Sequence, residues 1–295
     1  MSTPDWSVEG RDWPNRATSR FVDTGRMRWH VQTLGPESAN APVMLLLHGT
    51  GAATHSWRDV LPLLAKHFTV VAPDLPGHGF TTGRPVGGLS MAGMARAVGE
   101  LMTKLELIPD YIVGHSAGSA IALRMVLDGM AAPKAAIGLN PALMPFPGLA
   151  AKLFPTLARM LFVNPFAPQI FAAMARGPGE AKGFLERSTG SRIEPEGVDF
   201  YRRLFATSDH CAGALTMMAA WDLESLARDL PRVRVPLLIV TGDADAAIPL
   251  ASVQDAARLI PASRIEILPQ LGHLAHEERP DEVARLIGDF AREHE

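Results

Sequence analysis

The stretch YIVGHSAGSAIAL, residues 111–123, decides the fold. Residues 114–118 read G-x-S-x-G, with Ser116 at the centre. An apolar run precedes the motif and a helical pattern follows it, and this strand–turn–helix context lifts a serine hydroxyl above the end of a sheet. The flanking glycines allow the strand and the helix to approach the turn closely. An ordinary glycine-rich turn is the alternative, but the context favours a nucleophilic serine.

Outward from this stretch, short apolar runs alternate with helical patterns. Two early runs, 21–25 and 27–35, have the form of a hairpin. Five short runs follow later in the chain, and the first of them, VMLLLH, is apolar, as a strand buried on both faces is. They are 43–48, 68–74, 134–140, 235–243 and 263–269. The alternation predicts an α/β fold, with a mostly parallel central sheet and helices on both faces.

The alternation stops between Pro141 and Pro231, where only short helical patterns remain. We predict a helical lid over 141–231, inserted into a core made of 1–140 and 232–295. The lid is rich in phenylalanine and methionine, which suits an apolar small-molecule substrate, although such residues also serve simply to pack a lid onto a core. The candidate substrate contacts are Phe146, Met217, Met218 and Trp221.

A serine hydroxyl needs a base to take its proton. In hydrolases with this turn, the chain order is serine, then acid, then histidine. His273 directly follows the run 263–269, at the strand end where sites gather in open α/β sheets, so it is the candidate base. The other histidines after Ser116 are expected to lie elsewhere: His210 in the lid, His276 exposed to solvent at the start of the last helix, and His294 in the C-terminal tail.

The candidate acid is Asp245, which projects from the loop after the run 235–243. An acid at this point would hold the imidazole in the correct tautomer and stabilise its charged form. Asp243 is expected to anchor the turn instead. Some hydrolases take the acid from the end of the preceding strand, but Asn140 stands there and cannot be an anion.

The candidate oxyanion donors are the backbone N–H groups of Ala117 and Thr50. His48 is expected to shape the loop that carries Thr50. The sequence GTGAAT, 49–54, partly matches a dinucleotide-binding fingerprint, with Asp74 ending the next strand. That alternative lacks the third glycine, and it leaves the elbow serine and the late histidine without a role.

Composition excludes several other classes. The chain has 295 residues, a net charge of −3 and one cysteine, so an intrachain disulfide is impossible. No basic block indicates a nucleic-acid partner. No signal peptide and no apolar run of membrane-spanning length is present in the sequence, so we predict a cytoplasmic protein without a transmembrane segment. No metal-ligand spacing and no Walker loop occurs, and we predict no metal and no cofactor.

These motifs resemble the capped α/β-hydrolases, and DLPGHG, 74–79, resembles a conserved turn of that superfamily. The nucleophile is serine, which argues against the dehalogenase and epoxide-hydrolase chemistry that uses aspartate. A closer likeness runs over nearly the whole chain. The segments DWPNR (12–16), LLLHGTGAATHSWRD (45–59) and LGHLAHEERP (271–280) are similar to the magnesium-chelatase accessory proteins of bacteriochlorophyll synthesis.

The resemblance implies an α/β-hydrolase fold and a role beside magnesium chelatase, with a porphyrin as a candidate ligand and the photosynthetic membrane surface as a candidate location. Two hypotheses stay open: a serine hydrolase, such as a carboxylesterase or carbon–carbon bond hydrolase, and a non-catalytic porphyrin-holding protein. Several arginines are candidates to meet propionate carboxylates or to form a solvated face. They are Arg159, Arg176, Arg187, Arg192, Arg202 and Arg203.

Overall fold

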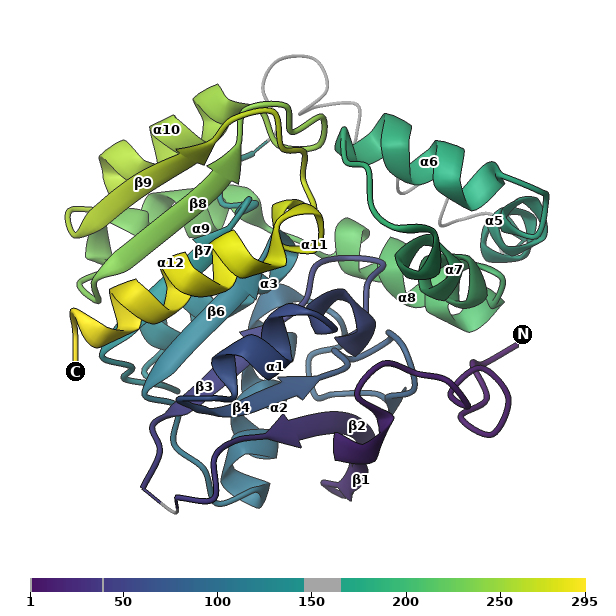
Figure 1. Ribbon diagram of the computed structural model, residues 1–295, viewed down its shortest axis with the longest axis horizontal. Helices are drawn as coiled ribbons and strands as arrows, with labels where there is room; N and C mark the ends of the chain where they lie inside the picture. The colour runs from purple at the N-terminus through teal and green to yellow at the C-terminus, as the bar shows by residue number, and fades with distance from the viewer. Residues whose placement is uncertain (1, 39, 146–165) are drawn as a thin grey trace.

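A central sheet organises the computed structural model, which describes residues 2–38, 40–145 and 166–295 (Figure 1). The strand order is β1-β2-β4-β3-β6-β7-β8-β9, and the short β5 pairs with β2. The strands are β1 (Ser19–Asp23), β2 (Met27–Leu34), β3 (Val43–Leu47), β4 (Thr69–Pro73), β5 (Thr82–Gly83), β6 (Tyr111–His115), β7 (Ala135–Leu139), β8 (Leu237–Gly242) and β9 (Ser263–Leu268).

Pairing is parallel from β4 through β3, β6, β7 and β8 to β9. β1 and β2 form an antiparallel hairpin, and β2 pairs antiparallel with β4 and β5. The predicted α/β fold with a mostly parallel sheet is therefore confirmed. The carboxyl ends of the parallel strands meet at one edge, which brings the loops after β3, β6, β8 and β9 together.

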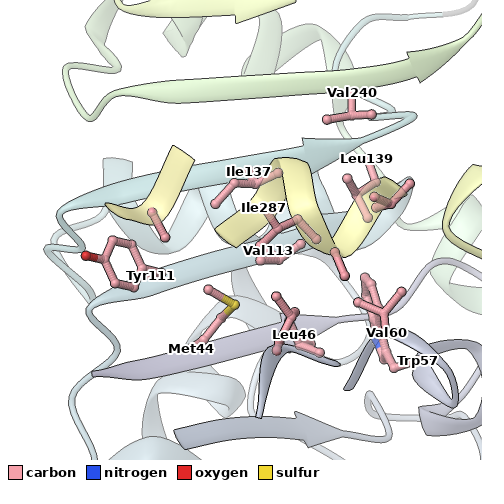
Figure 2. Close-up of a cluster of buried hydrophobic side chains, with 14 of the residues drawn as sticks. Met44, Leu46, Trp57, Val60, Tyr111, Val113, Ile137, Leu139, Val240 and Ile287 are labelled. Carbon is pink, nitrogen blue, oxygen red and sulfur yellow. The ribbon is translucent and has the colours of Figure 1, made fainter. Parts of the chain in front are cut away.

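Helices cover both faces of the sheet, because alternate side chains of the central strands point to opposite faces. One face packs on α1 (Val60–Leu64) and α12 (Pro280–Arg292). Figure 2 shows part of this core, in which Met44 and Val113 of the sheet belong to the same buried cluster as Ile287 of α12. The other face packs on α2 (Met91–Lys104), α3 (Ala117–Leu127) and α10 (Leu250–Leu259).

The described residues between β7 and β8 form helices. They are α5 (Ala167–Ala175), α6 (Glu180–Thr189), α7 (Pro195–Phe205), α8 (Ser208–Ala219), α9 (Leu223–Asp229) and the 3₁₀ turn η3 (Leu230–Arg232). Figure 1 shows α5 to α8 gathered beyond one end of the sheet. Leu226 of α9 and Leu230 pack in the core cluster beside α3. The lid boundaries at 141 and 231 stay a prediction, since α9 belongs spatially with the core.

The N-terminal DWPNR segment lies against the THSWRD segment, which holds the 3₁₀ turn η2 (Thr54–Trp57). The Trp13 indole N–H donates to Thr54 Oγ1 at 2.9 Å, and Asn15 Nδ2 donates to the carbonyl of Arg58 at 3.0 Å. Asp12 pairs with Arg203 of α7. Two of the three segments that carry the family likeness therefore contact each other, and the first also reaches the helices inserted after β7. A further 3₁₀ turn, η1 (Arg16–Thr18), follows.

No helix in the described ranges has both the length and the apolar character needed to cross a membrane.

Candidate active site

Ser116 occupies a strained turn between β6 and α3. Its φ of 50° and ψ of −115° lie outside the usual regions for a residue with a side chain. Such a conformation costs about 1–3 kcal/mol and persists where the surroundings impose it. A Cβ on Gly114 would lie 2.4 Å from Ser119 Cα, and a Cβ on Gly118 would lie 2.1 Å from the Leu47 carbonyl oxygen. The two motif glycines therefore permit the turn.

His273 and Asp245 are hydrogen-bonded to each other. His273 Nδ1–H donates to Asp245 Oδ2 at 2.8 Å, because a carboxylate can only accept. The other carboxylate oxygen accepts from the N–H groups of Ala247 at 2.7 Å and Ile248 at 2.9 Å. Asn140 Nδ2 adds a donor to Oδ2 at 2.8 Å. This arrangement leaves the lone pair of His273 on Nε2.

The backbone of His273 is held on both sides. Its N–H donates to the carbonyl of Thr189 at 2.8 Å, and its carbonyl accepts from His115 Nε2–H at 2.9 Å. His115 directly precedes the candidate nucleophile, so the chain at Ser116 is tied to the chain at His273. Every polar group of His273 except Nε2 is thus engaged.

Ser116 and His273 line one cavity, with a volume of about 770 Å³. The structure holds no hydrogen bond between Ser116 Oγ and the imidazole within its described residues. Bonds of this kind often tighten only when a substrate is bound. The structure brings the predicted serine, base and acid to the same sheet edge, and their catalytic roles stay a proposal.

Thr50 and Ala117 line the same cavity. Within the part of the chain that the structure describes, their backbone N–H groups donate to no protein group. Ala117 begins α3, where a backbone N–H has no partner inside the helix. His48 shapes the Thr50 loop as expected: its Nδ1–H donates to the Gly49 carbonyl at 2.8 Å, and its Nε2 accepts from Leu75 N–H at 2.8 Å. Burial lowers the pKa of His48, which suits a neutral structural ring.

The predicted substrate contacts divide into three cases. Met218 and Trp221 line the cavity. Met217 is fully buried in the core cluster with α2 and α3, and its sulfur accepts from Thr50 Oγ1 at 3.5 Å, so it packs rather than facing a ligand. Phe146 lies outside the described residues. Phe184, one of the lid phenylalanines, also lines the cavity, together with apolar residues that the sequence did not indicate: Leu185, Phe205 and Leu274.

The prediction that His276 is exposed to solvent was wrong. Its side chain is 1% exposed and packs against Trp57 and His115, because α11 (Ala275–Glu278) turns inward beneath the His273 loop. Burial, together with the nearby Arg58, lowers the pKa of His276 to about 3. The helical pattern in the sequence predicted one final helix that begins near His276. It did not indicate that the short helix α11 is separate from α12.

Two acids have structural roles. Asp243 Oδ1 accepts from Gln270 N–H at 2.6 Å, so it anchors the loop after β9 rather than its own backbone. Asp74 is fully buried and accepts from Thr54 N–H at 2.7 Å, Phe80 N–H at 2.8 Å and His30 Nδ1–H at 2.8 Å. These contacts occupy the carboxylate, as a structural anchor requires, and leave the dinucleotide alternative without its ribose acid.

Three contributors to the site escaped the sequence analysis. Asn140 was considered only as a missing acid, yet it donates to the acid that is present. His115 fills the variable position of the motif, and Thr189 acts through its backbone carbonyl. Only Asn140 carried a usable signal, since it ends a strand beside the one that precedes Asp245. The described lining of the cavity includes Asp222 and Glu224 but no arginine or lysine.

A family model described as the alpha/beta hydrolase family matches residues 44–286. The chain belongs to the alpha/beta hydrolase family. Over 282 residues it is 38% identical to the magnesium-chelatase 30 kDa subunit of Rhodobacter capsulatus, covering 95% of this chain and 96% of that subunit. The predicted likeness to the magnesium-chelatase proteins is thereby confirmed.

Two other proteins are more distantly similar to this chain. A fluoroacetate dehalogenase of Burkholderia sp. is 29% identical over 287 residues, which cover 92% of each chain. The solved structure of a thermophilic esterase from Thermogutta terrifontis matches with a TM-score of 0.74 at 23% identity, covering 94% of this chain and 99% of the esterase. This second likeness concerns the fold alone.

Proposed function

We propose that the chain is a serine hydrolase that acts beside magnesium chelatase in the magnesium-insertion step of bacteriochlorophyll synthesis. The observation that carries the hydrolase part is the His273–Asp245 hydrogen bond of 2.8 Å at the cavity that also exposes Ser116. The whole-chain identity to the magnesium-chelatase 30 kDa subunit supports the biological setting.

The proposed reaction is acyl transfer to water. Ser116 Oγ attacks the carbonyl carbon of an apolar ester while His273 Nε2 takes its proton. Asp245 holds the ring and stabilises its charged form. The N–H groups of Thr50 and Ala117 donate to the oxyanion, a contribution of about 3–4 kcal/mol per donor in hydrolases of this kind. His273 then protonates the leaving group, and water, deprotonated by the same ring, releases the acid product.

The serine at position 116 separates this chemistry from that of the dehalogenase relative. A carboxylate nucleophile would displace a halide and form an ester with the protein. A serine next to a histidine–aspartate pair is instead suited to esters and related carbonyl compounds. We therefore propose ester hydrolysis, with carbon–carbon bond hydrolysis as the related alternative.

Reaction with a fluorophosphonate probe tests the hydrolase site. The native protein is expected to be labelled at Ser116, and Ser116→Ala is expected to lose the label with an unchanged unfolding temperature. Equal labelling of the two proteins, or none of the folded native protein, would argue against the proposed chemistry.

A second candidate, a non-catalytic porphyrin-holding role, is favoured by the size and the largely apolar lining of the cavity. Complementation of a pigment-deficient strain separates the two. Rescue by native protein and not by folded Ser116→Ala supports hydrolysis, whereas full rescue by both supports holding. Titration with protoporphyrin adds a direct check, because a holding protein must shift the porphyrin absorption band.

A further inference from the structure

The link between α6 and α7 lies directly on the two loops that carry the candidate base and acid. The carbonyl of Thr189 accepts from His273 N–H at 2.8 Å and from Ala246 N–H at 3.3 Å. Ala246 is the residue after Asp245. One backbone oxygen from the inserted helices thus holds the base loop and the acid loop together.

The next residues of the link extend this contact. Ser191, 2% exposed, accepts from Leu274 N–H through its Oγ at 2.8 Å. Glu278 accepts from Arg192 N–H at 3.2 Å with one carboxylate oxygen and from Gly272 N–H at 2.8 Å with the other. The backbone N–H groups of residues 272, 273 and 274 are therefore all engaged, two of them directly by the link.

Two glycines allow this close approach. Gly190 has a φ of 70°, and a Cβ there would lie 2.3 Å from the carbonyl oxygen of Ala244 in the acid loop. A Cβ on Gly272, in the base loop, would lie 2.5 Å from Ser191 Oγ. Side chains at either position would push the link away from the loops.

We propose that residues 189–191 are a positioning segment that sets the place of His273 and Asp245. This proposal rests on the proposed hydrolase function. Proton transfer requires the imidazole within a fraction of an ångström of its working position, and a displacement of about 1 Å costs on the order of 100-fold in rate. Because Thr189 is bonded to both loops, a shift of α6 acts on the base and the acid together.

The simpler explanation is that the link merely packs the helices onto the core and that Gly190 only ends α6. The helix itself provides the control. Gly179, at the other end of α6, has a φ of 75°, and a Cβ there would meet no atom within 4 Å. Gly190→Ala and Gly179→Ala thus carry a similar backbone cost, but only the first pushes against the acid loop.

The experiment measures two quantities in both variants: the rate of fluorophosphonate labelling, and hydrogen exchange of the His273 and Leu274 amides. For Gly190→Ala we expect labelling at least 10-fold slower and exchange at least 10-fold faster. For Gly179→Ala we expect both rates within twofold of the native values. Equal effects in the two variants, or exposed amides with native labelling in Gly190→Ala, would overturn the proposal.

A milder pair covers the case in which Gly190→Ala does not fold. Ser191→Ala removes the acceptor of Leu274 N–H, whereas Ser263→Ala removes a hydroxyl bonded to Ala257 and Ile260 carbonyls at the start of β9, away from the site. Only Ser191→Ala is expected to slow labelling, at least threefold, and to expose the Leu274 amide. Equal behaviour of this pair would also overturn the proposal.

Failure of the proposed hydrolase function can be distinguished from failure of the positioning-segment proposal. If folded native protein is not labelled at all, the hydrolase proposal falls and amide exchange decides the positioning segment alone. Loss of protection at His273 in Gly190→Ala but not in Gly179→Ala would then support the segment, and equal protection would refute it.

Discussion

Two walls of the cavity are built in different ways. The first consists of loops at the strand ends and carries Thr50, Ser116 and His273, with Asp245 bonded to His273. Its base and acid are fixed by hydrogen bonds, such as the 2.8 Å bond from His273 to Asp245. The second consists of helices inserted after β7. Its apolar side chains are held by packing, and several stay exposed: Phe184 is 49% exposed and Met218 40%.

The difference separates chemistry from ligand choice. Groups that move protons need a fixed geometry, which a sheet edge supplies. Apolar contacts tolerate exchange and adjustment, which helices outside the sheet allow. Substitutions in the first wall are therefore expected to lower the reaction rate strongly, and substitutions in the second to change the affinity for the substrate. Substitutions where the two walls meet are expected to change the stability of the fold.

The largest effect is expected for Asp245→Asn. An amide in place of the carboxylate would accept poorly from His273 and permit the wrong tautomer, which costs on the order of 10⁴-fold in rate in serine hydrolases. The labelling rate should fall to that extent while the unfolding temperature changes little. A fall of less than 10-fold would mean that another group orients His273.

The next effect concerns a buried ion pair where the walls meet. Arg58 and Glu277 form this pair, and Tyr201 of α7 donates its hydroxyl to Glu277 at 2.6 Å. Glu277→Gln removes the buried counter-charge of Arg58 and leaves it only the half-exposed Asp59 at 3.2 Å, so unfolding in urea should show a loss of up to about 3–5 kcal/mol. The matched control is Glu293→Gln, which removes an exposed partner of Arg264 and should cost at most about 1 kcal/mol. Equal losses would contradict the difference in burial.

Lowering the pH should destabilise the protein at the contact between the two walls of the cavity. His210 of α8 donates to the Gly51 carbonyl and accepts from Gly79 N–H, both at 3.0 Å, and burial lowers its pKa from 6.5 to about 4. Unfolded chains take up this proton below pH 6.5 and the native state only near pH 4. Stability is therefore lost as the pH falls through that window, by roughly 3 kcal/mol for this residue at about 1.4 kcal/mol per pKa unit.

Urea unfolding between pH 7 and pH 4.5 measures this loss. Buried His276 contributes in the same direction, with a pKa of about 3. Since His210→Gln has no ring to protonate, its stability should depend less steeply on pH than that of the native protein. An unchanged slope would show that His210 does not govern the acid response.

The smallest effect is expected in the helical wall. Phe184→Ala shortens an exposed lining side chain, so labelling by a small fluorophosphonate should stay within twofold of the native rate. The KM for a long-chain ester should rise about 3- to 10-fold, in line with the value of a few methylene contacts. Ile108→Ala, which shortens a side chain that is 82% exposed and outside the cavity lining, should change neither quantity.

The sequence predicted the strand-end wall well because its signals are local. The elbow is read from five consecutive residues, and His273 and Asp245 are recognised by chain order and by their places directly after β9 and β8. The helical wall was harder. Met217 and Met218 are neighbours in sequence, yet about 100° of helix rotation separates them, and only the packing of α8 shows which one faces the cavity.

The contacts of residues 189–191 were beyond sequence reasoning for a different reason. Ser191 and Leu274 lie 83 positions apart, and no local pattern marks their meeting. The inward turn of α11 and the burial of His276 likewise depend on Trp57, far away in the chain. Sequence patterns predict the secondary structure of one segment, whereas these features depend on contacts between segments far apart in the chain.

The hold of Thr189 on the two loops runs through a main-chain oxygen. Any residue able to follow the same backbone path offers that oxygen, although here the Thr189 hydroxyl also supports the path, donating to the Leu185 carbonyl at 2.6 Å and accepting from Ser191 N–H at 3.1 Å. The surrounding helices are therefore free to change in sequence while this backbone contact to the loops of the proposed base and acid is kept. Relatives that keep the same backbone path at this position would keep the carbonyl contact even where the residue at this position differs.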